Sequence, residues 1–301
     1  MTNIKHGLFV GLATLDLIYL TEALPTQNQK IVALDYTVAA GGPATNAAVA
    51  FSYLGDRPTL LSIFGTHPIN QLVLADLEAC GVAIADLNPQ QTEPVPTSSI
   101  IVTKATGERA VVSLNAVRSQ ASLEQMEQAL GDRISPDTLS GVDIVLIDGH
   151  QMEVGREIAQ RAKAHQIPVV IDGGSWKPGF EQVLPLADYV ICSSNFHPPG
   201  CSTAKEVLAY LTHLDIPYIA ITQGGEPIQA FSKGTASLIP VPQICPVDTL
   251  GAGDIFHGAF CHYILQLSFE QAIAASASIA AQACKSFGTR TWMKSQRHRL
   301  E

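Results

Sequence analysis

Residues 248–260 read Asp-Thr-Leu-Gly-Ala-Gly-Asp-Ile-Phe-His-Gly-Ala-Phe. The small residues Gly251, Ala252 and Gly253 allow a tight backbone turn, and the apolar run that continues to about Leu267 predicts a buried helix directly after it. A glycine-rich turn that opens a helix is an anion site, because unpaired N–H groups and the positive end of the helix dipole face the same point. The stretch therefore predicts an anion-binding turn.

Asp254 falls in the first turn of this predicted helix. A carboxylate beside a phosphate site repels the phosphate, so its presence there needs a reason. The natural reason is to take a proton from an attacking hydroxyl while the amides hold the departing charge. Asp254 is thus a candidate general base of a phosphotransferase. The alternative is an acidic residue that only favours the helix dipole. The P-loop pattern is absent, and Phe256 stands where G-x-G-x-x-G needs its third glycine.

The composition is that of a core-rich globular protein, with 47% hydrophobic and 15% charged residues among 301. The net charge of −9 argues against a nucleic-acid binder, which would carry a basic surface. No apolar stretch reaches the roughly 18 residues that span a membrane. The six cysteines show no C-x-x-C or paired spacing, so we expect reduced thiols and a soluble, cytoplasmic protein.

The first part of the chain predicts one buried strand followed by segments of a separate sheet. The strand covers residues 7–14, and Asp16 follows it, where open α/β sheets place ligand contacts; Asp16 could equally be a turn residue. Period-two alternation over residues 30–38, and again in the predicted hairpin of residues 97–103 with 109–115, indicates strands with one covered face. We expect these segments to form a small antiparallel sheet.

Residues 40–46 read Ala-Gly-Gly-Pro-Ala-Thr-Asn. Gly41 and Gly42 would let the backbone approach a ligand closely, and the proline suits the first turn of a helix. That helix is expected from Ala44 to about Leu54. Asn46 in its first turn could point toward whatever the glycines contact. The alternative is an ordinary tight turn into a helix.

After residue 118 the pattern becomes an alternation of strands and helices. Short, unalternating apolar runs predict strands covered on both faces, and repeated strand–helix units imply a mostly parallel sheet. The predicted strands cover residues 142–147, 168–171, 189–192 and 218–221, and a hairpin covers 228–231 with 236–239. The predicted helices cover residues 122–130, 153–165, 203–214 and 269 to about 285.

Two stretches together resemble the signatures of the ribokinase-like (PfkB) carbohydrate kinases. Residues 40–46, with Gly55 and Gly65 at the following intervals, resemble the N-terminal signature, and residues 248–254 resemble the C-terminal one. The resemblance covers essentially the whole chain. Residues 11–16 and the Asp-Thr-Leu-Gly-Ala-Gly-Asp form are similar to ketohexokinases. Other stretches are similar to sulfofructose kinases, namely residues 24–25, 30, 41–44 and 254–259.

The resemblance implies a single ribokinase-like domain over residues 1–301. Its fold would be a three-layer α/β/α unit with a mostly parallel central sheet and a small antiparallel β lid. The lid segments would be residues of about 15–40 and 96–116. Enzymes of this family often form homodimers through such a lid, so the resemblance implies a homodimer here.

The resemblance also assigns roles to individual residues. Asp254 would be the base that deprotonates the sugar hydroxyl, and the turn before it would hold the transferring γ-phosphate. The phosphate would be bound by Gly251, Ala252 and Gly253, and sugar hydroxyls by Asp16, Gly41, Gly42 and Asn46. Such a reaction depends mainly on positioning and charge stabilisation.

ATP and Mg²⁺ are the implied cofactors. The Thr222-Gln-Gly224 stretch resembles the loop that lies under ATP, and Asn195 resembles the asparagine of the family's N-x-x-E motif. Pro198 stands where that motif has its glutamate, so the Mg²⁺ ligands are not assigned. A monovalent cation such as K⁺ could bind at Asp248 and the loop of residues 284–290.

Four further residues are specificity candidates, each with an alternative. Lys30 on the lid could meet an anionic group of the substrate or be a solvated lysine. Asn115, at the end of the second lid hairpin, could bond a sugar hydroxyl or cap a turn. Arg109 alternates with apolar neighbours and is expected to be exposed. His150 lies at the ligand-bearing edge of the sheet, or is a structural side chain.

The residues and the resemblance together predict an ATP-dependent kinase acting on a primary hydroxyl of a ketose or ketose-like sugar. Its partners would be the small-molecule sugar and ATP, with no nucleic acid and no membrane. A nucleoside kinase is the first alternative, because the same motifs serve adenosine-type substrates. A sugar or nucleotide sensor without catalytic activity is the second. Fold alone does not choose the sugar, which depends on a few lid contacts.

Overall fold

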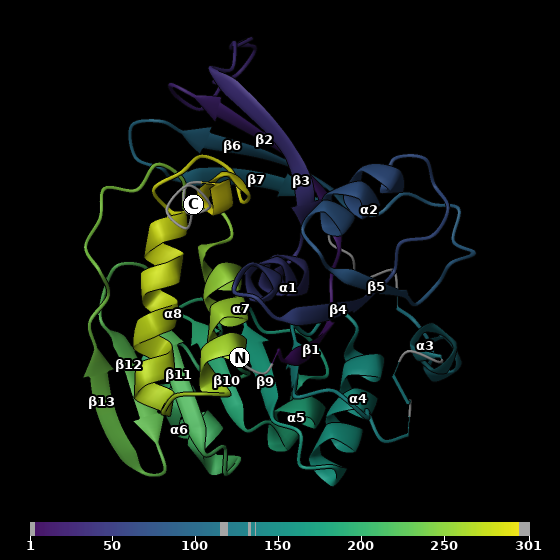
Figure 1. Cartoon of the computed structure of the whole chain (residues 1–301). Helices are drawn as coiled ribbons and strands as arrows, with labels where there is room; N and C mark the ends of the chain where they lie inside the picture. The colour runs from purple at the N-terminus through teal and green to yellow at the C-terminus, as the bar shows by residue number, and fades with distance from the viewer. Residues whose placement is uncertain (1–3, 115–119, 132–133, 136, 295–301) are drawn as a thin grey trace.

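The computed structural model describes residues 4–114, 120–131, 134–135 and 137–294. They form a nine-stranded sheet covered by helices on both faces, and a four-stranded sheet that stands at the top of the molecule (Figure 1). The fold class expected from the sequence, a three-layer α/β/α unit with a smaller sheet, is confirmed.

The large sheet is parallel over seven of its strands. The six neighbouring pairs from β11 to β5 are parallel, and the hairpin of β12 and β13 adds an antiparallel edge. The order across the sheet is β13 (Thr235–Ile239), β12 (Ile228–Ser232), β11 (Tyr218–Thr222), β10 (Tyr189–Ser193), β9 (Val169–Gly173), β8 (Ile144–Ile147), β1 (His6–Val10), β4 (Arg57–Ser62) and β5 (Ala83–Asp86).

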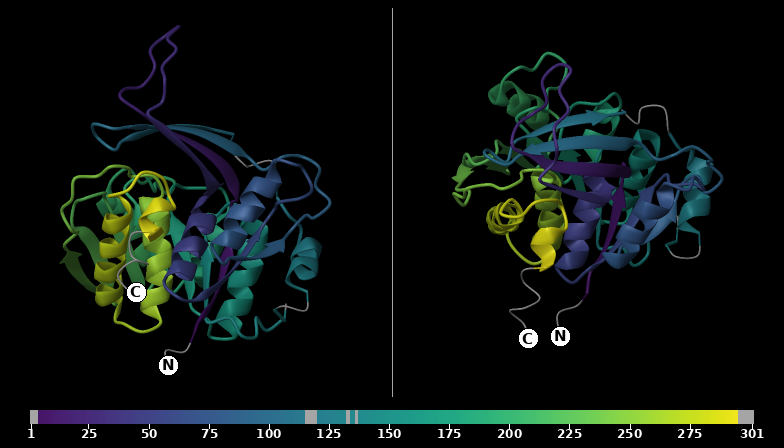
Figure 2. Two further views of the ribbon diagram at one scale, coloured as in Figure 1. Left: turned by 45° about the horizontal axis from the view of Figure 1, so that its top comes forward. Right: turned by 90° about the horizontal axis from the view of Figure 1, so that it is seen from above.

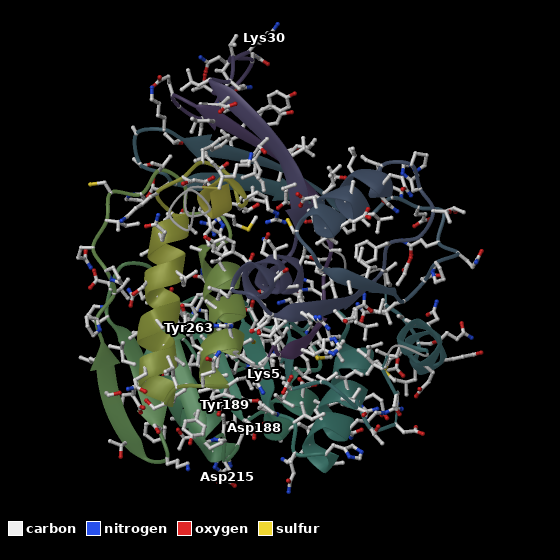
Figure 3. All side chains as sticks on the ribbon, viewed as in Figure 1. Lys5, Lys30, Asp188, Tyr189, Asp215 and Tyr263 are labelled. Carbon is white, nitrogen blue, oxygen red and sulfur yellow. The ribbon has the colours of Figure 1, made fainter. Side chains whose placement is uncertain are left out.

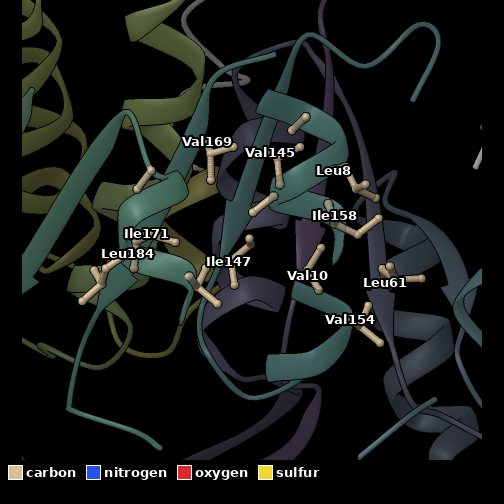
Figure 4. Close-up of a cluster of buried hydrophobic side chains, with 14 of the residues drawn as sticks. Leu8, Val10, Leu61, Val145, Ile147, Val154, Ile158, Val169, Ile171 and Leu184 are labelled. Atoms are coloured by element: carbon tan, nitrogen blue, oxygen red, sulfur yellow. The ribbon is translucent and has the colours of Figure 1, made fainter. Parts of the chain in front are cut away.

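Helices cover the two faces in two groups. The helices are α1 (Pro43–Tyr53), α2 (Asn70–Ala79), α3 (Leu123–Leu130), α4 (Met152–Ala164), α5 (Phe180–Val183), α6 (Ala204–His213), α7 (Ala252–Ile264) and α8 (Phe269–Ala283), with 3₁₀ turns at Leu184–Leu186 and Thr291–Met293. In β1, Leu8 and Val10 pack with α3 to α6, whereas Phe9 packs with α1, α2, α7 and α8. Figure 4 shows the first of these cores. Since both faces are buried, the strands read as continuous apolar runs.

The small sheet has the order β3 (Asp35–Gly41), β2 (Thr14–Thr21), β6 (Thr97–Thr103) and β7 (Arg109–Ser113). Its outer pairs are antiparallel, and its central pair, β2 with β6, is parallel. The loop of residues 22–34 between β2 and β3 extends away from the rest of the molecule (Figure 2). We call this four-stranded sheet the lid.

Two predictions at the N-terminus need correction. The predicted strand of residues 7–14 ends at Val10, and Thr14 already begins the lid strand β2. Asp16 is therefore inside a lid strand and not in the turn after a central strand. The strand predicted from residue 30 begins only at Asp35. Both errors have one cause: an apolar or alternating run shows that a segment is extended, but not where the chain passes between sheets.

Other boundaries differ by a few residues. The apolar run predicts a helix over residues 255 to about 267; the observed helix α7 begins three residues earlier, at Ala252, and ends at Ile264. Residues 57–86 contain β4, α2 and β5, none of which was predicted from the sequence. Among the described residues, no helix combines the length and the apolar composition needed to cross a bilayer.

Candidate active site

Helix α7 begins at the turn that the sequence singled out. Gly251 is its N-cap residue, and its φ of 71° lies in the left-handed region that favours glycine. A Cβ at this position would stand 3.1 Å from Cγ2 of Thr289 and 3.5 Å from Nδ2 of Asn46. A Cβ on Gly253 would meet only open space. The turn is thus packed on one side and open on the other, as a ligand cradle requires.

The N-cap residue of α7 is a glycine, so it offers the first amides of the helix no side-chain acceptor; the amide of Ala252 donates to the carbonyl oxygen of Thr249 at 3.3 Å. Gly251 makes no side-chain cap hydrogen bond, whereas α3, α6 and α8 each begin with a capping box built on Ser122, Thr203 or Ser268. Unpaired amides and the helix dipole make such an end favourable for an anion. The geometry agrees with the expected phosphate-binding role of Gly251, Ala252 and Gly253.

Asp254 lies in the first turn of α7 and is half-buried. Its Oδ2 accepts a 2.9 Å hydrogen bond from Nδ2 of Asn46 on α1. The contact joins the two sequence signatures, which are 208 residues apart. The structure thus brings the candidate base and a candidate sugar-binding residue into direct contact.

A second carboxylate lies close to Asp254. Asp172 on β9 is buried, and its Oδ2 is 3.5 Å from Nδ1 of His257, one turn along α7 from Asp254. The same Nδ1 is 2.7 Å from the carbonyl oxygen of Gly253, and Nε2 is 3.1 Å from that of Ile191. The imidazole therefore ties the anion turn to Asp172 and to the central sheet.

These surroundings set the protonation of Asp254. Burial is the largest cause and the charge of Asp172 the second, and together they raise the pKa of Asp254 to about 6. The hydrogen bond from Asn46 and the charges of His257 and Arg109 act in the opposite direction. A carboxyl with a pKa near the working pH is suited to general-base catalysis.

Gly41 and Gly42 are required by close packing against β2 and the residues before it. A Cβ on Gly41 would overlap the carboxylate of Asp16, and one on Gly42 would overlap the carbonyl oxygen of Leu12. Asp16 is buried, and its Oδ1 accepts a 2.7 Å hydrogen bond from Oγ1 of Thr14. Burial raises the pKa of Asp16, opposed by hydrogen bonds and by the charge of Arg290. The three predicted sugar-binding positions are therefore adjacent.

Asp148, directly after β8, fixes the loop that carries the first signature. Its carboxylate accepts hydrogen bonds from the amides of Leu12, Ala44 and His150, at 2.9, 3.1 and 2.9 Å. Burial alone would raise the pKa of Asp148, but His150, Lys177 and the amide of Leu12 outweigh it and lower the pKa to about 2. The carboxylate thus stays ionised and caps α1. No sequence pattern had indicated a role for Asp148.

The lid touches the segment that leads into the anion turn. The carbonyl oxygen of Gly107, in the β6–β7 turn, accepts hydrogen bonds from N and Oγ1 of Thr249. Nη1 of Arg109 donates to Oγ1 and to the carbonyl oxygen of Thr249, at 3.0 and 3.3 Å. A cleft of about 640 Å³ opens here, lined by Leu24, Thr103, Glu108, Arg109, Val111 and Thr249. Arg109 is exposed, as expected, and it is also a cation beside the anion turn.

The predicted nucleotide residues lie at the carboxyl edge of neighbouring strands. Thr222 ends β11, and Asn195 follows β10. The amide of Ser194 donates to the carbonyl oxygen of Thr222, so the two loops are joined. A Cβ on Gly224 would meet nothing within 4 Å. These residues lie in two loops at the carboxyl ends of the strands, where Asp148 and Asp172 also lie, and we call this open surface the shelf.

Three specificity candidates have different outcomes. Lys30 lies at the far tip of the extended lid loop, fully apart from the anion turn (Figure 3). Asn115 lies outside the described residues. Nδ1 of His150 is 3.1 Å from Oδ1 of Asp148, so this histidine supports the carboxylate that caps α1.

Oxygen atoms that could bind a cation lie near the start of the anion turn. Asp248 accepts hydrogen bonds from the amides of Leu250 and Gly288, at 2.8 and 2.9 Å, and burial raises its pKa. Oγ1 of Thr289 is buried without a hydrogen-bond partner. Among the described residues, no three His, Cys, Asp or Glu side chains converge on a point where a metal ion could bind.

Comparison with known proteins identifies the family. The model of the pfkB family of carbohydrate kinases matches residues 5–296. The chain is a pfkB family carbohydrate kinase. It is therefore a sugar or nucleoside kinase, a phosphotransferase that acts on an alcohol group, and the predicted ribokinase-like resemblance is confirmed.

Characterised relatives support the same assignment. The ribokinase of Bacillus subtilis (strain 168) is 23% identical over 252 residues, which cover 83% of each chain. The ketohexokinase of Mus musculus is 22% identical over 302 residues, which cover 93% of this chain and 96% of that one. Both kinds of kinase are thus similar to this chain at nearly equal identity.

Solved structures agree over almost the full length. A provisionally named ribokinase from Agrobacterium tumefaciens superposes with a TM-score of 0.80 and 26% identity, covering 99% of both chains. Arabidopsis thaliana ribokinase, complexed with ribose and ATP, superposes with a TM-score of 0.74 and 20% identity, again over 99% of both chains. The fold is that of the ATP-using ribokinases.

Proposed function

We propose that the protein transfers the γ-phosphate of ATP to a hydroxyl of a ketose or ketose-like sugar, with Asp254 as general base. The observation that carries this proposal is the position of Asp254, a half-buried carboxylate in the first turn of a helix whose N-cap is a glycine without a capping side chain. The same turn offers a proton acceptor and an anion cradle within a few residues, which phosphoryl transfer requires.

The residues would act in a simple sequence. Asp254, held by Asn46, accepts the proton of the attacking hydroxyl. The amides that begin at Gly251 stabilise the negative charge of the transferred phosphoryl group. Arg109 adds a positive charge from the lid, and the lid contacts at Gly107 hold it against the anion turn. A lid in this place keeps water from competing with the sugar.

The sugar would lie between the lid and the start of α1. Asp16, Gly41 and Gly42 are adjacent there, and Asn46 links them to Asp254. A buried carboxylate and closely approaching backbone are suited to hydroxyl groups. Lys30 and Asn115 remain predicted substrate contacts. Thr222, Gly224 and Asn195 form the shelf that we assign to ATP.

The cations fit the donor sets to different degrees. Mg²⁺ neutralises phosphate charge when bound, and it would be held mainly by phosphate and water, with Asn195 nearby, because the described residues contain no carboxylate cluster. A monovalent cation such as K⁺ fits better beside Asp248 and the loop of residues 284–290, where the hydroxyl of Thr289 is buried and unpartnered.

We also propose a cytoplasmic homodimer that associates through the lid. Tyr36, Val38 and Val112 are exposed, and the strand register places them on one face of the lid. An exposed apolar sheet face of this kind is commonly covered by a partner. The six free cysteines suit a reducing compartment.

The alternatives are less well supported. A nucleoside kinase would need aromatic or large apolar lid residues at the base, but the two candidate tyrosines, Tyr19 and Tyr36, pair on the exposed face of the lid, opposite to the buried Ile18. A sensor without activity would not need Asp254, Asp172 and the open anion turn to remain together.

The direct test is ADP release with Mg-ATP and a panel of acceptors. The panel contains fructose, tagatose, ribose, 6-phosphorylated ketoses, sulfofructose and adenosine. We expect turnover with a ketose or ketose-like member. Turnover confined to adenosine would replace the proposal by a nucleoside kinase. Bound ATP without turnover on any member would favour a sensor or an acceptor outside the panel.

Asp254 predicts the pH dependence of the reaction. A base must be deprotonated, so kcat/KM should fall as the pH drops through about 6, the pKa of Asp254 in the free enzyme. Asp172→Asn removes the negative charge that raises this pKa, so the midpoint should move to lower pH. Asp188→Asn, at the opposite end of the parallel strands, should leave the midpoint in place. An unchanged or higher midpoint in Asp172→Asn would contradict the assignment.

Arg109 predicts a lid effect on the nucleotide. Arg109→Gln should lower kcat/KM for ATP by about 10- to 100-fold, the loss expected for a charge-assisted hydrogen bond. Lys104→Gln is the matched control, since it also removes a positive charge from the β6–β7 turn. In the contacts described, the side chain of Lys104 forms an ion pair only with the exposed Glu22. Equal effects of the two variants on initial rates would show that only the net charge of the lid matters.

A further inference from the structure

Arg290 connects the segment that carries it to three other elements of the molecule. It lies between α8 and the final 3₁₀ turn, and its side chain is only 14% exposed. Nε donates to Oδ2 of Asp76 on α2 at 3.1 Å, and Nη2 donates to the carbonyl oxygen of Ala40 on β3 at 2.7 Å. Nη1 donates to Oδ1 of Asn46 on α1 at 3.0 Å. One guanidinium thus binds a helix, a lid strand and the residue that contacts the candidate base.

The contact with Asn46 determines which end of its amide faces Asp254. An amide has one accepting oxygen and one donating nitrogen. Because Arg290 occupies the oxygen, the nitrogen is left to donate to the carboxylate of Asp254. The reversed amide would place its NH₂ against a guanidinium and its oxygen against a carboxylate. Both contacts would be repulsive, so Arg290 selects one orientation.

The same ion pair holds the end of a lid strand. The amide of Ala40 donates to Oδ2 of Asp76 at 2.9 Å, and its carbonyl oxygen accepts from Arg290. β3 is the edge strand of the lid, so it has a strand neighbour only on the β2 side. Asp76 and Arg290 supply partners on the other side, directly before Gly41. The base of the lid and the amide of Asn46 therefore share one anchor.

We propose that Arg290, anchored by Asp76, is a positioning residue: it holds the amide of Asn46 with its nitrogen toward Asp254 and couples that orientation to the base of the lid. The inference rests on the proposed role of Asp254 as general base. Arg290 itself does not contact the reacting atoms.

Loss of this orientation has a defined consequence. The charged groups that act on Asp254 are Asp172 from β9, His257 from α7 and Arg109 from β7, and they remain when Arg290 is replaced. The hydrogen bond from Asn46 favours the ionised carboxylate. A free amide can instead turn its oxygen toward a protonated Asp254. The acid limb of the pH profile, where kcat/KM falls as the pH drops, should therefore move to higher pH.

The test compares Arg290→Lys with a control. Lysine keeps a positive charge near Asp76 but lacks the planar fork that reaches three acceptors. We expect the acid limb to rise by about one pH unit, which is about a tenfold loss of kcat/KM below pH 6 and little loss at pH 9. Arg161→Lys, in a half-buried pair with Glu127 and Glu157 on the far face of the sheet, should lower the melting temperature without moving the limb.

A second background tests the route through Asn46. If Arg290 acts through that amide, Arg290→Lys should move the limb no further in an Asn46→Ala chain, because the two effects are not additive. A full additional shift there would overturn the inference, as would a lower melting temperature in Arg290→Lys with an unchanged limb. If Arg290→Lys folds poorly, Asp76→Asn should shift the limb in the same direction.

The inference can fail separately from the proposed function. A parent chain that turns over no acceptor would defeat the proposed function. The ¹³Cγ titration of Asp254, assigned by its absence in Asp254→Asn, needs no substrate and still decides the role of Arg290. A higher midpoint in Arg290→Lys supports the inference, and an equal midpoint overturns it.

Discussion

Asp254→Asn is expected to lower kcat by about 10²- to 10⁴-fold, the usual contribution of a positioned general base. The asparagine has nearly the same shape and can still accept the hydrogen bond from Asn46 through its oxygen. Fold and sugar affinity should therefore change little. The residual rate would come from the anion turn and from the positioning of the two substrates.

Initial rates of ADP formation, with sugar binding by calorimetry and thermal melting, separate catalysis from folding. Asp86→Asn is the matched control, because Asp86 accepts hydrogen bonds from the amides of Phe64 and Gly65 and lies outside the candidate site. It should lower the melting temperature and leave kcat near the parental value. A near-parental kcat in Asp254→Asn would reject Asp254 as the base.

Gly42→Ala is expected to be the most damaging glycine substitution at the candidate site. Gly42 has φ of 103° and joins the lid strand β3 to α1, and a Cβ there would overlap the carbonyl oxygen of Leu12. Left-handed strain costs about 1–2 kcal/mol and overpacking about 1–3 kcal/mol. The free energy of unfolding should therefore fall by about 2–5 kcal/mol. Since Asn46 follows four residues later, kcat should fall as well.

Gly55→Ala isolates the strain from the overlap. Gly55 has nearly the same φ, 101°, but a Cβ there would meet nothing within 4 Å. The free energy of unfolding of Gly55→Ala should fall only by the cost of the strain, about 1–2 kcal/mol, and the variant should keep its activity. Urea unfolding and initial rates of both variants make the comparison. Equal losses of stability would show that contact with Leu12 is unimportant.

Much of the architecture follows from local sequence patterns. Unalternating apolar runs identified β8 to β11, because strands buried on both faces need no polar side. The glycines of residues 41–42 and 251–253 identified both turns of the site. At Gly42 and Gly251 the positive φ explains why glycine is needed. Such patterns are readable because they depend on the backbone of only a few consecutive residues.

The roles of the lid residues could not be read in this way. Asp16 was expected just past the end of a central strand and lies inside the lid strand β2, because extended backbone alone does not show which sheet a segment joins. Arg109 is exposed, as expected, but its contact with Thr249, 140 residues away, was not foreseen. An alternating pattern shows only which side of a strand a residue faces.

By itself, the sequence determined the layered α/β fold and the glycine-rich turn that opens α7, and it singled out Asp254 as the candidate base, since each depends on neighbouring residues. Only the tertiary structure decided what surrounds the base. Asp172 and Asp148 reach one edge because parallel strands end there, and Arg290 meets Asn46 across 244 residues of chain. Their charges and hydrogen bonds set the pKa and orientation of the site, and these interactions act through space rather than along the sequence.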